Sequence, residues 1–544
     1  MKKHILYAIP LFASCLVACS DWDDHFNNGG SGDAGSNTTL WQMINENPQL
    51  SDFAEVLEET KVFRQHKKTS VSYAQLLDGG QSFTVVAPVN NSFNKDSLLN
   101  MVQTAQGDSV VEKSFIFNHI SRSLSSVTAE DKRVLLLNDK YADFEDAMIE
   151  GVTMISPNQR AKNGILHVAE SPVPFERNLY EMLCDDSLMS SIGAILREYE
   201  EDYFDAESSI SSGMIEGVPI YVDSVIIERN RMLDYLGYLN SEDSLYLVAA
   251  PTKDEWNRVW KETSKYFNYH SKMNKRDSLV QHWTMRSLMQ DAVFSVALNP
   301  WYDKENKVAT DSLVSVPYSR PSNYRKPVYH VFQNPFADGG ILANAREIEC
   351  SNGTIYQLDE WTYDPLKTFF QEMWVEVETQ AYINEKKSCF YNTRRLTADS
   401  ISDGAYLQIL PEGGNSNWEL TFLVPNTLSA HYDICAIVLP QTIVYPDQTF
   451  KPCKFNATIN YVDEKGAAQT LKSKSAFQTD PTRIDTVVLA ENFYFPACNY
   501  RQTNNDVTVK LQCQITAKEN MKYSREMYLD CIYLRPRLDE SNEE

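Results

Sequence analysis

Few residues in this chain of 544 have the type and spacing to carry chemistry. The first is Cys19, whose thiol follows the small residues Val17 and Ala18 at the end of a segment with a basic start and an apolar core over residues 5–16. These features are typical of a secretory signal peptide. The apolar core is shorter than the ~20 residues that span a bilayer. Residues 1–18 are therefore predicted to be a signal peptide.

The tetrapeptide Leu16-Val17-Ala18-Cys19 resembles the lipobox of bacterial lipoproteins. The resemblance implies cleavage before Cys19 and a lipid, such as palmitate, on its thiol. The acidic segment Ser20-Asp21-Trp22-Asp23-Asp24 resembles the export signal that places lipoproteins of glycan-scavenging Gram-negative bacteria on the outer cell surface. The alternatives are a plain signal cut near Ala18, with the Cys incidental, and an acidic tether left in the periplasm.

A tether is predicted between the lipid and the folded protein. Residues 27–36 consist of Asn, Gly, Ser, Asp and Ala, and they cannot bury apolar area. Ten such residues behave as a flexible coil with a typical reach of ~16–19 Å. Residues 19–39 are therefore expected to be a lipidated, flexible tether to the outer membrane. No second apolar run is long enough to span a bilayer, so the lipid would be the only anchor.

Histidine and carboxylate side chains give no catalytic signature. His119 lies in an apolar helical stretch and His167 in a strand, so both are predicted to be hydrogen-bonded core residues. The chain contains no His-Glu-x-x-His, Gly-x-Ser-x-Gly, phosphate-loop or dinucleotide motif and no Cys-x-x-Cys metal spacing. The 74 Asp and Glu residues offer chance pairs, but geometry would be needed to nominate a glycosidase pair. We therefore expect no enzyme, no metal site and no cofactor.

Aromatic residues in the last third of the chain are the candidate binding residues. Trp418, Tyr406 and Tyr445 lie near Gly- and Asn-rich turns such as Gly413-Gly414-Asn415-Ser416-Asn417. Turns at the ends of a β-sandwich commonly carry binding residues, and aromatic rings can stack on sugar rings. Core or rim packing of each ring is the alternative.

Composition limits the classes of function. A net charge of -24 disfavours nucleic-acid binding, because phosphate neutralisation needs a basic surface. The length exceeds what one hydrophobic core usually holds, so three or four domains are expected. Six cysteines lie in the last third of the chain. They are expected to be either buried free thiols or partners in disulfides.

Two α+β regions are predicted from a pattern that occurs twice. In the first copy, Phe83–Ala87 is a buried-strand run that Pro88 ends, and Asn90 is a plausible N-cap for a following helix. Asn163-Gly164 then forms a tight turn into the strand at residues 165–168. In the second copy, Ser244–Thr252 repeats the strand and the Pro, and Ser351–Leu358 repeats the turn and strand. Thr252 and Glu255 form a capping-box pattern.

The first copy resembles a fasciclin domain. Residues 84–93, which end at Phe93, match that family's first box and residues 163–168 its last, while Asn118-His119 keeps only the His of the Tyr-His box. The second copy is more divergent: Trp256 replaces the Phe, Tyr356 replaces the His, and Gln281-His282-Trp283 is the nearest candidate for the Tyr-His box. The resemblance implies fasciclin-like α+β domains at residues 40–175 and 176–364.

The last third changes character to short strands. Trp374–Thr379, Glu419–Val424, Tyr432–Leu439, Phe455–Tyr461 and Val507–Gln512 alternate apolar and polar residues, as half-buried strands do. Residues 365–544 are therefore predicted to form an antiparallel β-sandwich. The order of the segments resembles jelly-roll, galactose-binding-like modules of surface lipoproteins.

These expectations combine into a functional hypothesis. We expect a cell-surface lipoprotein that acts as a non-catalytic adhesion or ligand-binding accessory to a TonB-dependent transporter of oligosaccharides or peptides. The alternatives are a structural or matrix-adhesion protein with no soluble ligand and, less favoured, a glycan-active enzyme. This ranking rests on analogy between folds.

Overall fold

The structure is a computed structural model that describes residues 37–538, except residues 65–66, 186–189, 216–217, 300–301, 304–307, 310–311, 317, 320–326, 397, 399 and 504–505. The signal peptide, Cys19 and most of the tether lie outside the described residues. The chain divides into two compact units, with the boundary between Phe175 and Glu176.

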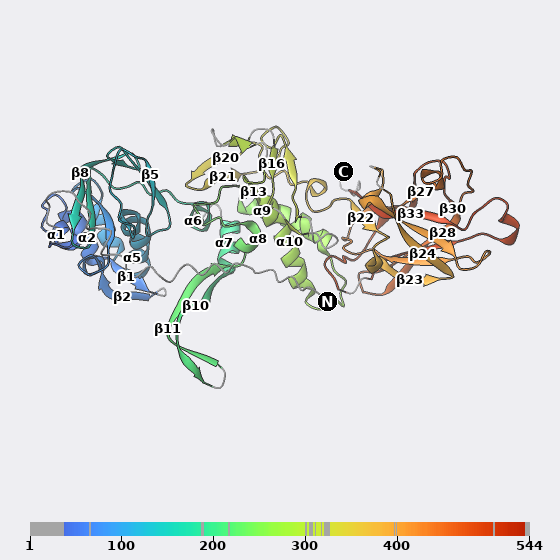
Figure 1. The fold of residues 1–544 in the computed structure, drawn as a ribbon, viewed down its shortest axis with the longest axis horizontal. Coiled ribbons are helices and arrows are strands. Elements are labelled where there is room, and N and C mark those ends of the chain that lie inside the picture. The colour runs from blue at the N-terminus through green and yellow to red at the C-terminus, as the bar shows by residue number, and fades with distance from the viewer. Residues whose placement is uncertain are drawn as a thin grey trace, which may run out of the picture. The chain divides into compact units, whose positions relative to one another are not determined.

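The first unit is an α+β fold built around a seven-stranded sheet with the order β4-β3-β9-β8-β7-β6-β5 (Figure 1). Its helices are α1 (Leu40–Asn45), α2 (Ser51–Glu59), α3 (Tyr73–Leu77), α4 (Lys95–Met101), α5 (Ala105–Val111), the π-helical turn η1 (Glu112–Ile116) and the 3₁₀ turn η2 (Phe117–His119). Its strands are β1 (Lys61–Arg64), β2 (Lys67–Ser72), β3 (Phe83–Pro88), β4 (Ile120–Ser121), β5 (Lys132–Leu135), β6 (Tyr141–Glu145), β7 (Met148–Ile149), β8 (Val152–Ala161) and β9 (Gly164–Ala169). A separate hairpin joins β1 and β2.

The Asn-Gly turn before β9, which we call the Asn-Gly hub, connects several elements of this fold through hydrogen bonds. The Asn163 side chain accepts a hydrogen bond from the Leu40 N–H at 2.8 Å and donates to the carbonyls of Leu77 and Gly79 at 2.8 and 2.9 Å. A Cβ on Gly164 would lie 2.0 Å from the Phe83 carbonyl oxygen, so only glycine fits. One buried amide therefore fixes α1, the end of α3 and the parallel pairing of β3 with β9.

The second repeat uses the same hub. Asn352 accepts from the Leu179 N–H at 2.8 Å and donates to the carbonyls of Leu239 and Ser241 at 2.8 and 3.0 Å. A Cβ on Gly353 would meet the Tyr246 carbonyl oxygen at 1.9 Å. Strands β12 (Tyr246–Pro251) and β21 (Gly353–Leu358) pair in parallel, as β3 and β9 do. The two copies of the pattern therefore share the same Asn-Gly contacts and the same parallel strand pair.

The second repeat centres on a four-stranded sheet with the order β13-β12-β21-β20 (Figure 1). Its helices are α6 (Leu179–Asp185), α7 (Ser190–Glu198), α8 (Leu233–Leu236), α9 (Lys253–Ser264), the 3₁₀ turn η4 (Lys265–Phe267) and α10 (Arg276–Ala292). Its other main strands are β10 (Glu200–Ile215), β11 (Val218–Asn230), β13 (Val293–Ser295), β16 (Ser312–Val314), β19 (Val331–Gln333) and β20 (Arg346–Cys350). Strands β10 and β11 pair along their length as a two-stranded ribbon.

Three local predictions in the repeats are wrong. Asn94, not Asn90, caps the following helix α4; the Asn90 side chain instead accepts from the Asp52 N–H at the start of α2. Thr252 makes no side-chain cap, and the Glu255 carboxylate binds Arg258 and the Trp361 N–H instead of the start of the helix.

The candidate for the Tyr-His box in the second repeat is also misplaced. Val85 pairs with Ile120 in the first sheet, and Val248 pairs with Val293 in the second. His119 therefore corresponds to Ala292, ten residues after His282.

The C-terminal region is an antiparallel sandwich of two six-stranded sheets, and the predicted fold class is thereby confirmed (Figure 1). One sheet contains β22 (Met373–Glu376), β24 (Cys389–Arg395), β25 (Ala405–Pro411), β27 (His431–Leu439), β31 (Asp485–Tyr494) and β33 (Met527–Arg537). The other contains β23 (Ile383–Lys387), β26 (Glu419–Leu423), β28 (Lys454–Val462), β29 (Ala468–Lys472), β30 (Phe477–Gln478) and β32 (Thr508–Cys513). Alternate residues of both sheets fill one core between them.

The second repeat and the sandwich share part of this core. Phe267 and Tyr269 of the second repeat are buried among the sandwich residues. The Ser429 N–H donates to the Tyr266 carbonyl at 2.9 Å, and the Cys498 N–H donates to the Asn268 carbonyl at 2.9 Å. Both regions accordingly belong to one compact unit.

Candidate functional site

Two of the three predicted binding aromatics are buried, so the prediction is wrong for them. Trp418 is 0% exposed, and its indole N–H donates to the Arg525 carbonyl at 2.6 Å. It shares the inward-facing period of Leu420 and Phe422 in β26. Tyr406 is 4% exposed and packs against Tyr528, with ring centroids 5.0 Å apart. Neither ring is available to stack on a sugar.

Tyr445 remains a candidate binding residue. It is 47% exposed and follows the 3₁₀ turn η8 (Gln441–Ile443), with its ring 6.2 Å from that of Phe450. Cys19, the predicted lipidation site, lies outside the described residues.

The two histidines have structural roles, as predicted. His119 Nδ1 lies 2.6 Å from the Phe115 carbonyl, and Nε2 accepts from the Val173 N–H at 3.1 Å. Burial lowers the pKa of His119 to about 4, so it is neutral at physiological pH. His167 Nε2 lies 2.9 Å from the Ser125 carbonyl, and burial lowers its pKa as well. Each imidazole thus joins distant backbone segments.

The eight cysteines of the described residues are free thiols, and all except Cys350 are buried. Burial raises the pKa of Cys435 to about 11 and that of Cys498 to about 12. Such thiols are protonated and inert near neutral pH.

A row of apolar side chains crosses the outer face of the sheet that contains β33. Trp374 in β22 pairs with Tyr533 in β33, which pairs with Cys435 in β27, which in turn pairs with Val488 in β31. Their neighbours along each strand, such as Val375 and Leu534, point into the core, so these four side chains point outward. Trp374 is 40% exposed and Val488 41% exposed. We call these four residues the outer-face row.

Trp374, Tyr533 and Val488 of the outer-face row reach the surface, while Cys435 between them is buried, and polar groups lie beside the row. The rings of Trp374 and Tyr533 lie 4.5 Å apart, and the Tyr533 hydroxyl is hydrogen-bonded to Glu372. An exposed pair of aromatic rings with a few placed polar groups is typical of a ligand-binding surface. The row is therefore the strongest candidate binding surface in the described residues.

Carboxyl groups lie next to the outer-face row at the β22 end. Glu376 is two residues from Trp374 on the same face, and it accepts a hydrogen bond from the Ser402 hydroxyl at 2.5 Å. Asp530, 1% exposed, accepts from the Ser402 N–H at 3.2 Å. Burial, together with repulsion from nearby carboxylates, raises the pKa of Asp530 and of Glu378 to about 7. These groups can therefore hold protons near neutral pH and donate hydrogen bonds.

Two arginines flank the row on the other side. Asp433, 1% exposed, accepts from Arg535 at 2.6 Å and from Arg537 at 2.5 Å through one carboxylate oxygen. The other oxygen accepts from the Asn492 N–H at 2.9 Å. Burial alone would raise the pKa of Asp433, but the hydrogen bonds from Arg537, the Asn492 N–H and Arg535 hold it at about 2. This ionised group fixes the edge of the face where β27, β31 and β33 meet.

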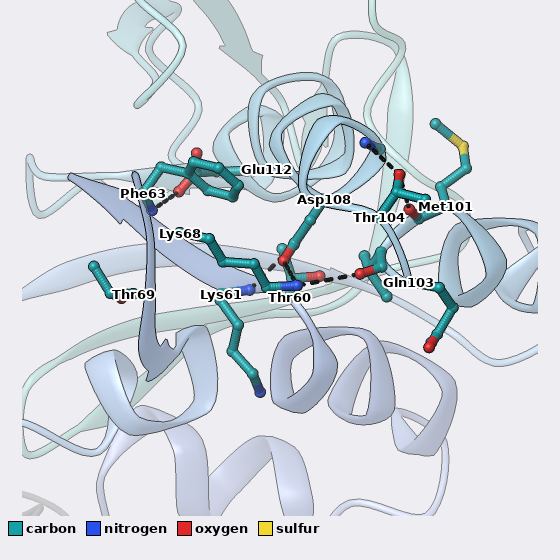
Figure 2. A network of polar contacts seen from close by, with 12 residues as sticks. Thr60, Lys61, Phe63, Lys68, Thr69, Met101, Gln103, Thr104, Asp108 and Glu112 are labelled. Carbon is teal, nitrogen blue, oxygen red and sulfur yellow. Dashed lines mark hydrogen bonds and ion pairs between the residues drawn. The ribbon is translucent and has the colours of Figure 1, made fainter. Parts of the chain in front are cut away.

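Figure 2 shows a second polar network, in the first unit, where the β1–β2 hairpin lies against α5. Asp108 accepts from the Lys61 N–H at 3.2 Å, and Glu112 in η1 accepts from the Phe63 N–H at 2.8 Å. The Lys68 ammonium lies 2.5 Å from Asp108. Both carboxyls are almost fully buried, and burial raises the pKa of Glu112. Since Lys61 and Phe63 lie in β1 and Lys68 lies in β2, the network attaches the hairpin to the helix.

Two further properties bear on function. No three or more His, Cys, Asp or Glu side chains are arranged to hold a metal ion in the part of the chain that the structure describes. No helix there has the length and apolar character needed to cross a membrane.

The outer-face row was missed by sequence reasoning, although the sequence carries its signal. The segment Trp374-Val375-Glu376-Val377-Glu378 alternates, and its two valines mark the inward face. The opposite face therefore presents a tryptophan and two carboxyls. An aromatic residue on the polar face of a half-buried strand is a stronger binding signal than one next to a turn.

Comparisons with known proteins do not assign this chain to a family. No protein-family model matches the chain, and no curated protein matches it. A FAS1 domain pair from the insect cell adhesion molecule fasciclin I is similar over 59% of this chain and 99% of its own, with 14% identity and a TM-score of 0.19. A xylan-binding domain from carbohydrate-binding module family 22 is similar over 30% of this chain and 93% of its own, with 10% identity and a TM-score of 0.20.

A tailspike protein of bacteriophage CBA120 is similar over 29% of this chain and 20% of its own, with 8% identity and a TM-score of 0.21. Scores this low add nothing to the argument. The fasciclin and galactose-binding-like resemblances continue to rest on the sequence patterns.

Proposed function

We propose that the protein is a non-catalytic surface lipoprotein whose C-terminal sandwich binds a glycan on the outer-face row. The observation that carries the proposal is the exposed Trp374 ring beside Tyr533, in line with Cys435 and Val488 across four strands. The exposed pair of aromatic rings matches the apolar face of sugar rings. The carboxyl groups beside it match the hydroxyls.

Neutral sugar rings fit this surface best. Glu372 and Glu376 lie at or near one end of the row, next to Glu378 and Asp530, which are partly ionised at neutral pH. The chain as a whole carries a net charge of -24. Like charges repel at short range, and salt screens them only beyond ~8–10 Å. An anionic polymer on the outer-face row would therefore be disfavoured.

The test is binding of the full chain to neutral oligosaccharides by isothermal titration calorimetry. Trp374→Ala should weaken binding by at least tenfold, because truncation of an aromatic anchor in a binding surface costs ~2 kcal/mol. Phe390→Ala is the matched control: Phe390 is 55% exposed on the same face but lies in the edge strand β24. Equal affinity of Trp374→Ala and the native chain would refute the assignment.

The anchoring part of the proposal is a lipid on Cys19 that holds the protein in the outer membrane, facing the exterior. The acidic segment after Cys19 supports the exterior location, because it resembles a surface-export signal. Replacing Asp21, Asp23 and Asp24 with Ala should keep the protein in the membrane but protect it from protease added to intact cells. Equal cleavage of variant and native protein would contradict surface export.

The proposed partner is an outer-membrane, TonB-dependent transporter of oligosaccharides or peptides. The support is the resemblance of the N-terminus to surface lipoproteins together with a non-catalytic binding surface. Purification of the native lipoprotein from detergent-solubilised outer membranes should recover such a transporter. Recovery of the protein alone favours the alternative of an adhesion protein that works without a transporter.

A further inference from the structure

Several carboxyl groups meet at the β22 end of the outer-face row, and one serine joins two of them. Ser402 begins the 3₁₀ turn η7 (Ser402–Gly404). Its hydroxyl donates a hydrogen bond to Glu376 of β22 at 2.5 Å, and its N–H lies 3.2 and 3.3 Å from the two carboxyl oxygens of Asp530 in β33. Two carboxyl groups from two neighbouring strands therefore share the hydrogen-bond donors of one residue.

A third carboxyl group extends this set. Glu378 follows Glu376 by two residues, and the Val377 side chain between them is buried in the core. The Oε2 atoms of both glutamates are buried and accept no hydrogen bond from a described residue. We call Glu376, Glu378 and Asp530 the carboxyl cluster. Asp403, which follows Ser402 directly along the chain, is exposed and adds negative charge.

The carboxyl cluster has no cation to balance it among the described residues. None of its three carboxyl groups forms an ion pair there, in contrast to Asp433 on the same face, which two arginines hold. Burial raises the pKa of Glu376 and, with repulsion from the neighbouring carboxyl groups, raises the pKa of Glu378 and of Asp530 to about 7. The cluster is therefore neutralised by protons, which it gains and loses near neutral pH.

The other titratable groups around the cluster do not change this balance. Strand β24 lies beside it, because the Thr393 hydroxyl donates to the Glu378 carbonyl at 3.2 Å. Arg395 of that strand is exposed and forms no ion pair with a described carboxylate. In the sheet itself, the thiols of Cys531 and Cys435 are buried, and burial raises the pKa of both, so they stay protonated near neutral pH.

The carboxyl cluster lies one step along the strands from the exposed pair of rings. Trp374 pairs with Tyr533, and Glu376 pairs with Cys531. Two residues of a strand span about 7 Å, so a ligand longer than one sugar ring that follows β22 from the Trp374 ring covers Glu376. Covering removes water from the cluster, and the loss of water favours the uncharged carboxyl group. The complex therefore holds more protons at neutral pH than the free chain does.

We propose that the carboxyl cluster couples glycan binding on the outer-face row to proton uptake, so that the protein holds a neutral glycan more tightly at acidic than at alkaline pH. The inference rests on the proposed function, since it concerns the same surface. Protonated carboxyl groups also donate hydrogen bonds, which sugar hydroxyls accept.

The sign of the effect follows from linkage. Binding raises the pKa of the cluster, so the gain in affinity is complete below the pKa values of the free chain and is lost as pH rises above those of the complex. A rise of about 1 in the pKa of one carboxyl group corresponds to about a tenfold change in affinity.

The experiment is isothermal titration calorimetry of the full chain with cellohexaose, maltohexaose and mannohexaose, which carry no titratable group near neutral pH. Affinity is measured at pH 5.5, 7 and 8.5, and at pH 7 in two buffers that differ in their enthalpy of ionisation. The affinity should fall about tenfold from pH 5.5 to pH 8.5. The difference in apparent binding enthalpy between the two buffers should show net proton uptake at pH 7.

The double variant Glu378→Gln, Asp530→Asn removes the two carboxyl groups whose pKa is about 7. It should flatten the pH profile and abolish most of the proton uptake, whatever its affinity at pH 5.5. Glu491→Gln is the matched control, because Glu491 is an exposed carboxylate in β31 of the same sheet, and it should keep the native profile and uptake. If the double variant does not keep the native unfolding midpoint at pH 5.5, Glu378→Gln alone takes its place and should reduce both effects.

The outcomes separate this inference from the proposed function. Binding with the same affinity at all three pH values and without proton uptake overturns the coupling and leaves the binding surface standing. Proton uptake that persists unchanged in the variant overturns the role of the carboxyl cluster. Tighter binding at pH 8.5 than at pH 5.5 overturns the sign of the effect. Binding of none of the sugars at any pH overturns the proposed function, and the inference with it.

Discussion

Replacing Glu378 with Gln is predicted to stabilise the protein at alkaline pH and to leave its stability at acidic pH unchanged. Its Oε2 atom is buried and accepts no hydrogen bond from a described residue. Burial, with added repulsion from Glu376, raises the pKa of Glu378 from 4.5 to about 7. Below pH 4.5 the carboxyl is protonated in both the folded and the unfolded chain. Above pH 4.5 the unfolded chain loses this proton while the folded chain keeps it. As pH rises through about 7, the folded chain loses the proton too, and the stability that the protonated Glu378 contributed is lost.

The two pKa values set the size of the effect. The difference of 7 - 4.5 = 2.5 pH units corresponds to ~3 kcal/mol, at 1.36 kcal/mol per unit. Because part of Glu378 remains in contact with water, solvent screening reduces the expected gain to ~1–2 kcal/mol. Glutamine has nearly the same shape and cannot ionise, so Glu378→Gln should recover this amount at pH 8.5.

Urea denaturation at pH 4, 7 and 8.5 measures the effect, provided that the slope of the transition is the same for native chain and variant. Glu491→Gln is the matched control, because Glu491 is exposed in β31 of the same sheet. The control should change stability by ~0.5 kcal/mol or less at every pH. A loss of stability in Glu378→Gln at pH 8.5, or an equal change at all three pH values, would refute the reasoning.

Cys19→Ser should move the protein from membrane to soluble fractions, since the lipid on this residue is the proposed anchor; retention in washed membranes would count against it. Phe93→Ala should lower the free energy of unfolding by ~2 kcal/mol, because the Phe93 ring packs 5.1 Å from that of Phe115 but is only half-buried. A fully buried ring would cost ~3–5 kcal/mol. Thermal unfolding measures the change, and an unchanged midpoint would contradict it. Asp433→Asn should cost ~1–2 kcal/mol at pH 7, allowing for screening at the exposed arginines. The pKa of Asp433 is depressed from 3.8 to about 2, so the difference should be full above pH 3.8 and vanish as pH falls through about 2; a constant difference in acid-unfolding curves would exclude it.

Local pattern was sufficient to predict most of the fold. The strand before Pro88 and the Asn163-Gly164 turn were placed correctly, because a buried run, a missing N–H and a backbone that only glycine can adopt are properties of a few adjacent residues. The same reasons allowed the second repeat to be found through Asn352-Gly353. Alternation likewise predicted the sandwich strands, among them β27 and β28.

The candidate sites were predicted less well, because exposure depends on what packs over a side chain. Trp418, Tyr406 and Tyr445 are all aromatic residues near turns, yet only Tyr445 is exposed. Trp418 points inward by its strand period, and Tyr406 points outward but is packed against Ile401, Leu439 and Tyr528.

The sequence by itself determined the signals that are local: the lipobox-like N-terminus, the repeated Asn-Gly hubs and the alternating strands. Only the tertiary structure decided which side chains meet. Sheet register aligned Trp374 with Tyr533 across 159 residues of sequence, and packing of the second repeat against the sandwich brought Trp283 to Arg501. Such contacts depend on register and docking, which are properties of the whole chain, so no window of adjacent residues encodes them.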